Sequence, residues 1–193
     1  MTSHRRAIFL DRDGVITANV YYERWKEWEA PMSPGDVELL PNAAEALLRF
    51  QRKGYLLFIV SNQGAYAKGK IALESLVATA KHVEALLAGA GVEITESYYS
   101  YSHPQGVVSD FSGISLERKP SPYFPRLAAA SHGVDLSNSW MVGDRDTDIL
   151  CGRAAGCRTL RIFSPHAEAA SVTPDLEAQT LFDAVEMLVN FVS

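Results

Sequence analysis

The chain has 193 residues, of which 47% are hydrophobic and 21% are charged, and its formal net charge is −5. This composition is ordinary for a globular protein, and the length predicts a single domain over residues 1–193 with a buried core. The acidic balance disfavours a nucleic-acid partner, since such proteins carry a basic excess that neutralises phosphates. No run approaches the roughly 20 apolar residues that span a bilayer, so we expect no membrane partner and a cytoplasmic location.

Short apolar runs alternate with segments of helical spacing along the whole chain. In chain order, the pattern predicts strands over 7–10, 55–60, 94–99, 139–142 and 159–163. Between and after them it predicts helices over 42–53, 71–88, 123–131, 147–155 and 181–192. Strands that alternate with helices are typical of a parallel sheet. The predicted fold class is therefore α/β, a three-layer Rossmann-like parallel sheet with helices on both faces and no large cap domain.

Two long segments, residues 16–35 and 100–122, interrupt this alternation. Long loops in a compact domain are usually functional, and in parallel sheets they gather where ligands bind, so we expect both to shape a substrate pocket. The first contains four aromatic residues, Tyr21, Tyr22, Trp25 and Trp28. Trp25 and Trp28 are three apart, a spacing that one helical turn would present together. The rings could stack on a sugar or cover the sheet end, and the sequence leaves both roles open.

Four polar segments, residues 11–14, 61–64, 118–120 and 143–148, each follow a predicted strand or the loop after one. In a parallel sheet all four would meet at the same edge. The carboxylates of Asp11 and Asp144 are the hard oxygen ligands that Mg²⁺ prefers. The hydroxyl of Ser61 and the ammonium of Lys119 can hold the oxygens of a phosphoryl group.

This combination predicts covalent phosphoryl transfer. Asp11 would attack the phosphorus atom, and Asp13 would protonate the leaving oxygen and then deprotonate the attacking water. Each segment alone is ambiguous, because an Asp-x-Asp turn often caps a helix and a Ser-Asn pair often forms a plain turn. The four segments together, each at a strand end, favour a phosphatase.

The motifs Phe-Leu-Asp-Arg-Asp-Gly (9–14), Val-Ser-Asn-Gln-Gly (60–64), Arg-Lys-Pro (118–120) and Val-Gly-Asp-Arg (142–145) resemble those of the haloacid dehalogenase superfamily of phosphatases. The resemblance covers about residues 7–163. Within the superfamily, the chain is most similar to the D-glycero-D-manno-heptose 1,7-bisphosphate 7-phosphatase branch, with the histidinol-phosphate phosphatases as neighbours. It implies magnesium as the cofactor and a small phosphorylated metabolite, such as a heptose bisphosphate, as the substrate.

The same resemblance implies a role for each motif residue. Asp11 would be the nucleophile and Asp13 the acid and base. Magnesium would be held by Asp11, the backbone carbonyl of Asp13 and Asp144. Substrate and phosphate binding would fall to Ser61, Asn62, Arg118, Lys119 and Arg145, with Asp148 supporting the site from behind.

The chain departs from this branch in one loop. Relatives hold zinc with cysteines and a histidine before the Arg-Lys-Pro motif, whereas the corresponding positions here are Ser-Tyr-Ser (100–102) and Ser-Leu-Glu (115–117). Neutral serines are poor zinc ligands, so no zinc is expected. In place of zinc, the packing of four aromatic residues would hold the loop: Tyr98, Tyr99, Tyr101 and Phe111.

The sequence leaves three alternative functions open. A histidinol-phosphate phosphatase would need an anionic pocket for the substrate amine, from Glu23, Glu27, Glu29 or Glu117. A nucleic-acid 3′-phosphatase shares the motifs but is disfavoured by the acidic balance. A catalytically silent binding protein is disfavoured because Asp11, Asp13, Lys119 and Asp144 are all present. A monomer is expected, and a dimer is left open.

Overall fold

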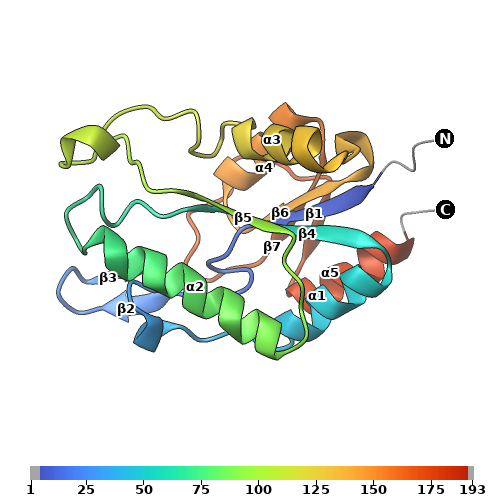
Figure 1. Ribbon diagram of the computed structural model, residues 1–193, viewed down its shortest axis with the longest axis horizontal. Coiled ribbons are helices and arrows are strands. Elements are labelled where there is room, and N and C mark those ends of the chain that lie inside the picture. The colour runs from blue at the N-terminus through green and yellow to red at the C-terminus, as the bar shows by residue number, and fades with distance from the viewer. Residues whose placement is uncertain (1–4, 191–193) are drawn as a thin grey trace.

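The computed structural model describes residues 5–190, and its centre is a six-stranded sheet in the order β5-β4-β1-β6-β7-β8 (Figure 1). Every neighbouring pair in this sheet is parallel, so all six carboxyl ends lie at one edge. The two neighbours of the central strand are in register with it, since Ile8 lies opposite Leu57 and Trp140. The strands are β1 (Arg6–Leu10), β4 (Tyr55–Asn62), β5 (Glu96–Ser100), β6 (Trp140–Gly143), β7 (Arg158–Ile162) and β8 (Leu176–Ala178).

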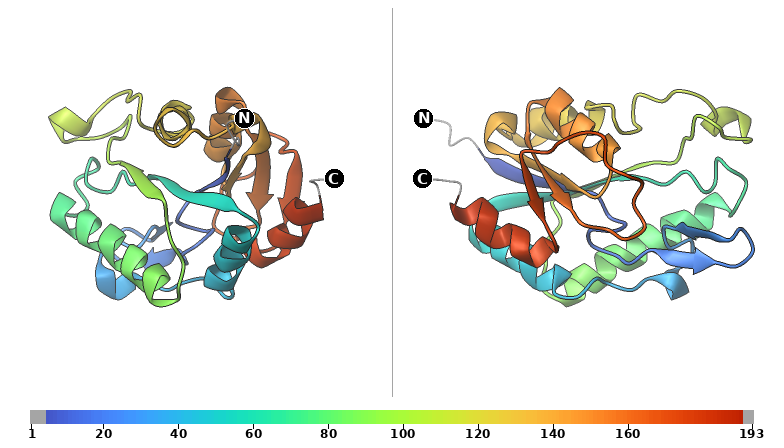
Figure 2. Two further views of the ribbon diagram at one scale, coloured as in Figure 1. Left: turned by 45° about the vertical axis from the view of Figure 1, so that its right-hand side comes forward. Right: turned by 180° about the vertical axis from the view of Figure 1, so that it is seen from behind.

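Helices cover both faces of the sheet (Figures 1 and 2). One face carries α1 (Ala43–Arg52), α2 (Leu73–Gly89) and α5 (Leu181–Asn190), and the other carries α3 (Tyr123–His132) and α4 (Asp146–Ala155). Successive side chains of β1 alternate between two cores: Ile8 and Leu10 join the first, and Ala7 and Phe9 join the second. The predicted fold class is confirmed. Residues 191 and 192 of the last predicted helix lie outside the described residues.

The segment 16–35 contains a small hairpin in place of the helical turn that the tryptophan spacing allowed. Strands β2 (Val20–Tyr22) and β3 (Glu27–Glu29) pair antiparallel, with Tyr21 opposite Trp28. Trp25 lies in the connecting turn, where Lys26 has a positive φ of 54°. The helical expectation is wrong because this turn reverses the chain between the two tryptophans.

The segment 100–122 is held by backbone hydrogen bonds and by ring contacts, among them the predicted packing of Tyr101, which stacks on Tyr99 with centroids 6.3 Å apart. The amide of His103 donates to the carbonyl of Phe111 at 2.9 Å, and the amide of Val107 donates to the carbonyl of Ala67 at 2.7 Å. The ring of Phe111 packs edge-on against Tyr66, with centroids 5.0 Å apart. Within residues 5–190, no helix is long and apolar enough to cross a membrane.

Candidate active site

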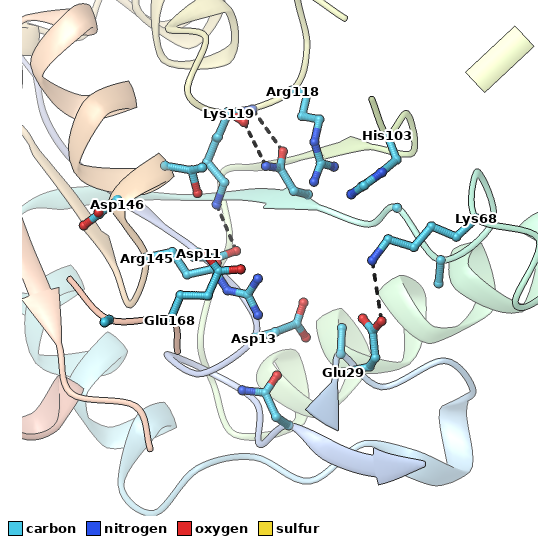
Figure 3. Close-up of a pocket in the computed structure, with 17 residues that line it drawn as sticks. Asp11, Asp13, Glu29, Lys68, His103, Arg118, Lys119, Arg145, Asp146 and Glu168 are labelled. Atoms are coloured by element: carbon cyan, nitrogen blue, oxygen red, sulfur yellow. Dashed lines mark hydrogen bonds and ion pairs between the residues drawn. The ribbon is translucent and has the colours of Figure 1, made fainter. Parts of the chain in front are cut away.

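A cavity of about 290 Å³ opens at the carboxyl edge of the sheet (Figure 3). Five of the predicted phosphatase residues line its inner wall: Asp11, Asp13, Asn62, Lys119 and Arg145. The opposite side is lined by Glu29 from the hairpin, Lys68 and His103, with Arg118 between the two walls. The sheet therefore brings together residues that are separated by more than a hundred positions in the sequence.

Asp11 lies directly beyond the end of β1, where its backbone amide donates to the carbonyl of Val142 at 2.9 Å. Its Oδ1 accepts a hydrogen bond from the amide of Arg12 at 2.7 Å and lies 3.0 Å from Nζ of Lys119. Lys119 is 3% exposed, and its ammonium also lies 2.6 Å from Oδ1 of Asp148. Burial alone would lower the pKa of Lys119, but the two carboxylates outweigh it and raise that pKa.

Asn62 holds the backbone of Lys119 in place from the end of β4. Its Nδ2 donates to the carbonyl of Lys119 at 3.1 Å, and its Oδ1 accepts from the amide of Lys119 at 3.0 Å (Figure 3). Nζ of Lys119 donates in turn to the carbonyl of Val60 at 2.6 Å. These bonds fix the lysine against β4, so little side-chain conformational entropy is left to lose when its ammonium contacts Asp11.

Asp11, Asp144 and Asp148 form a buried acidic cluster in which one carboxylate oxygen of each lies within 4.8 Å of the others. Neither oxygen of Asp144 has a hydrogen-bond partner among the described residues. Burial, followed by repulsion from Asp11 and Asp148, raises the pKa of Asp144 to about 7. Buried carboxylates without donors fit a hard divalent cation, which prefers oxygen ligands.

Two glycines permit this close approach. Gly14 has a φ of +82°, and a Cβ atom there would lie 2.4 Å from Oδ2 of Asp144. At Gly143 a Cβ atom would lie 2.2 Å from the side chain of Asp148. Any larger residue at either position would displace a carboxylate of the cluster.

Asp148 and Arg145 are linked at the start of α4. Oδ2 of Asp148 accepts a hydrogen bond from the amide of Arg145 at 3.0 Å, which caps the helix. The Arg145 side chain is half-exposed and lines the cavity, with its Nε 4.0 Å from Oδ1 of Asp144. Asp148 is fully buried behind Lys119, and Arg145 is the cation that reaches toward the opening.

Three residues without a role in the sequence analysis surround Asp13: Arg12, Thr17 and Gln63. Oδ1 of Asp13 accepts from Nε of Arg12 and from Oγ1 of Thr17, both at 2.9 Å, and Oδ2 accepts from Nε2 of Gln63 at 2.5 Å. The same Nε2 donates to Oγ of Ser61 at 2.9 Å, and Ser61 is buried behind the cavity wall. Arg12 and Gln63 belong to two of the phosphatase motifs, and this was the sequence feature that pointed to them. The amino-acid sequence alone does not show which side chains they contact.

The outer wall of the cavity is rich in paired charges. Nζ of Lys68 lies 3.6 Å from Oε1 of Glu29, and Nζ of Lys70 lies 2.5 Å from the same oxygen. Nη1 of Arg118 donates to the carbonyl of Ser102 at 2.8 Å, which anchors this arginine on the loop. Burial and then the nearby Arg118 lower the pKa of His103. Glu29 is thus neutralised by lysines, while Arg118 is free of an acidic partner among the described residues.

Comparisons with known proteins agree with this site. A family model described as HAD-hydrolase-like matches residues 116–184. A D-glycero-D-manno-heptose-1,7-bisphosphate 7-phosphatase of Thermosynechococcus vestitus is 34% identical, with 95% of each chain covered. A D-glycero-beta-D-manno-heptose-1,7-bisphosphate 7-phosphatase of Vibrio cholerae is 33% identical, over 95% of this chain and 96% of the relative. The structure of a D,D-heptose 1,7-bisphosphate phosphatase from B. bronchiseptica, complexed with magnesium and phosphate, superposes with a TM-score of 0.78 at 22% identity, over 97% of this chain and 99% of the other.

The parallel sheet, the carboxylates at its edge and these relatives together define a phosphoric monoester hydrolase. More closely, the chain belongs to the HAD-like phosphatase family, in the group that contains the heptose-1,7-bisphosphate 7-phosphatases.

Proposed function

We propose that this phosphatase depends on magnesium, forms a phosphoryl-enzyme on Asp11 and acts on a phosphorylated sugar. The observation that carries the proposal is the pairing of Asp11 with Lys119 beside the donor-poor carboxylate of Asp144. The names of the relatives support a heptose bisphosphate as the substrate. The magnesium and phosphate in the B. bronchiseptica structure support both the cation and the ester class.

In the first step, Asp11 attacks the phosphorus atom. Lys119 and the Arg12 amide occupy Oδ1 of Asp11, so Oδ2 is the oxygen left to form the new bond to phosphorus. As that bond forms, the ester bond between phosphorus and the leaving oxygen breaks, and its electron pair stays with the oxygen. Negative charge gathers on the phosphoryl oxygens, where the positive charge of Lys119 offsets it and the Ser61 hydroxyl donates a hydrogen bond.

Asp13 acts as the general acid in the first step and as the general base in the second. It gives its proton to the leaving oxygen, which departs as an alcohol. It then takes a proton from water as the water oxygen bonds to phosphorus and the bond to Asp11 breaks. Inorganic phosphate leaves, and the proton gained restores Asp13 for the next cycle.

The residues that would hold the magnesium ion are Asp11, Asp144 and the backbone carbonyl of Asp13. When bound, the ion supplies positive charge that offsets the phosphate dianion against three neighbouring carboxylates. Asp148 is occupied by Lys119 and the Arg145 amide, so it supports the cluster from behind.

The charges of the cavity favour a substrate with a second anionic group. Arg118 and Arg145 both line it, and Arg118 is anchored by a carbonyl instead of a carboxylate. For a histidinol-phosphate phosphatase, an unpaired acidic residue would have to face the substrate amine. Of Glu23, Glu27, Glu29 and Glu117, only Glu29 lines the cavity, and it is paired with lysines. Glu168 also lines the cavity and is the carboxylate that would have to take that role.

Phosphate release from heptose 1,7-bisphosphate, other phosphosugars and histidinol phosphate, with and without magnesium, tests the proposal. We expect the heptose bisphosphate to give the highest kcat/KM, with activity lost on chelation. Asp11→Asn keeps the shape of the side chain but removes the nucleophile, so turnover should fall at least ~1000-fold while the melting curve remains cooperative. Turnover of Asp11→Asn at the parent rate would exclude the phosphoryl-enzyme.

A further inference from the structure

A closed ring of hydrogen bonds surrounds the carboxylate of Asp13. Nε of Arg12 donates to Oδ1 of Asp13 at 2.9 Å, and Nη2 of Arg12 donates to Oε1 of Gln63 at 2.8 Å. Nε2 of Gln63 closes the ring on Oδ2 of Asp13 at 2.5 Å. Outside the ring, Oγ1 of Thr17 adds a second donor to Oδ1 at 2.9 Å. Arg12, Thr17 and Gln63 are all at most 2% exposed, so water does not compete for these bonds.

The ring fixes both oxygens of Asp13. Donors on a single oxygen would leave the carboxylate free to turn about its Cβ–Cγ bond, whereas donors on both oxygens set the plane of the group. Arg12 also sets the orientation of the Gln63 amide, because a guanidinium can only donate and therefore takes Oε1 as its acceptor. Nε2 of Gln63 must then face Asp13.

The amide of Gln63 also reaches the phosphate-binding hydroxyl. Its Nε2 donates to Oγ of Ser61 at 2.9 Å, a bond that uses an oxygen lone pair and leaves the hydroxyl proton free for a phosphoryl oxygen. The backbone of Gln63 is itself fixed, because its amide donates to the carbonyl of Ser100 at 2.7 Å. One buried side chain thereby links Asp13 and Ser61 to the end of β5.

We propose that Gln63, with Arg12 and Thr17, is a positioning residue that holds Asp13 in the orientation needed to protonate the leaving oxygen. The inference rests on the proposed function, since it requires Asp13 to be the proton donor. Asp13 lines the cavity, whereas Gln63 is not among the described residues that do so. Gln63 therefore acts through its neighbours and makes no contact with the substrate.

The test compares two esters that differ in their need for a proton. The alkoxide that leaves a phosphorylated sugar is strongly basic and needs protonation, whereas the phenolate that leaves p-nitrophenyl phosphate does not. In Gln63→Leu we expect kcat/KM for the phosphosugar that the parent hydrolyses fastest to fall about 10–100-fold, a fraction of the ~10²–10⁴-fold effect of a whole acid–base group. The value for p-nitrophenyl phosphate should change by less than about 5-fold.

Thr17→Val provides a milder variant that tests the same carboxylate if Gln63→Leu fails to fold. Thr79→Val is its matched control, because Thr79 is equally buried but, within residues 5–190, its hydroxyl bonds only to the carbonyl of Ser75 in α2. Thr17→Val should lower the ratio of phosphosugar to p-nitrophenyl phosphate kcat/KM, and Thr79→Val should leave that ratio unchanged. Equal losses on both esters in Gln63→Leu and Thr17→Val would overturn the positioning role.

Asp13→Asn distinguishes a failure of the positioning role from a failure of the proposed mechanism. If Asp13→Asn shows the selective loss and the ring variants do not, the ring has no positioning role and the proposed mechanism stands. If Asp13→Asn lowers kcat/KM equally for both esters, Asp13 is not the proton donor to the leaving oxygen, because kcat/KM does not contain the later attack of water; the positioning role then fails together with that part of the mechanism. A selective loss in all three variants supports both.

Discussion

The ammonium of Lys119 is the one buried cation beside three carboxylates in the described structure. It lies 3.0 Å from Asp11 and 2.6 Å from Asp148, so two of the three have a partner. Asp144 does not, and its closest cation is the half-exposed Arg145 at 4.0 Å. A buried carboxylate in this position destabilises the folded protein until a cation or a proton reaches it.

Asp144→Asn should therefore stabilise the metal-free protein. The amide keeps the size of the side chain and removes repulsion from Asp11 and Asp148, the second cause of its raised pKa after burial. We expect a gain of about 2 kcal/mol in the free energy of unfolding, or about 4–8 °C in Tm for a chain of this size. Thermal melts in the presence of a chelator measure this change.

The control for Asp144→Asn is Asp183→Asn. Asp183 caps α5 through hydrogen bonds from Thr180 and lies on the exposed surface. Loss of that cap should lower Tm slightly, which is the opposite sign. A lower Tm for Asp144→Asn without magnesium would mean that its carboxylate is compensated by something other than a cation.

At the level of single residues, sequence reasoning could predict the groups that carry chemistry but not the groups that hold them. Asp11, Lys119 and Asp144 belong to motifs whose residue types match phosphoryl transfer. Gln63 and Thr17 are ordinary polar residues, and their importance arises only from which atoms they meet in space. For Gln63 that information depends on the packing of β1 against β4, and for Thr17 it depends on the turn after β1 that pairs it with Asp13.

Two elements far apart in the sequence, each of which carries residues of the cavity wall, contact one another. The ring of Trp28, on β3, stacks on His166, with centroids 3.7 Å apart and planes inclined by 11°. His166 belongs to the segment between β7 and β8, which also carries Glu168 and Ala169 on the cavity wall. The stack therefore joins the hairpin, which carries Glu29 on the cavity wall, to the segment that carries Glu168 and Ala169.

Trp28→Ala should loosen this wall and weaken substrate binding. An aromatic pair contributes about 0.5–1.5 kcal/mol beyond its buried area, so KM for the phosphosugar should rise about 2–10-fold. The change in kcat should be under about 2-fold, because Trp28 is not among the described residues that line the cavity with Asp11 and Lys119. Steady-state kinetics on the phosphosugar measure both values.

A double-mutant cycle with His166→Ala identifies the contact itself. If the stack is responsible, the double variant should raise KM no further than either single variant. Additive effects would indicate that Trp28 and His166 act separately. Trp25→Ala is the matched control, since Trp25 lies in the turn of the same hairpin and its ring packs on Tyr22 and not on His166.

At the level of elements, the long periodic helices and the apolar strands of four or more residues could be predicted, and the three-residue strands could not. The tryptophan spacing allowed a helical turn where the structure has β2 and β3, because three-residue strands give too little alternation to outweigh one coincident spacing. Strand β8 was missed for the same reason, and it is stabilised by pairing with β7 instead of by its own pattern.

For the whole molecule, the alternation of strands and helices predicts a parallel sheet, but it does not predict the strand order. The order β5-β4-β1-β6-β7-β8 places β1 between β4 and β6. Because of this order, the carboxylates after β1 and β6 are neighbours, and Lys119 reaches them from the loop before α3. Strand order depends on tertiary packing, so the acidic cluster could be predicted by its motifs and not by any periodicity.

Because the acidic cluster joins β1, β6 and α4, a cation bound there should stabilise the fold as a whole. A ligand that binds only the folded state adds about 2.7 kcal/mol at 100 times its Kd, which corresponds to about 5–11 °C in Tm here. We expect Tm to rise with magnesium concentration along this logarithmic dependence. In Asp144→Asn the rise should be reduced or lost, although the metal-free variant begins from a higher Tm. Equal magnesium-induced shifts in the parent and in Asp144→Asn would show that the ion binds elsewhere on the protein.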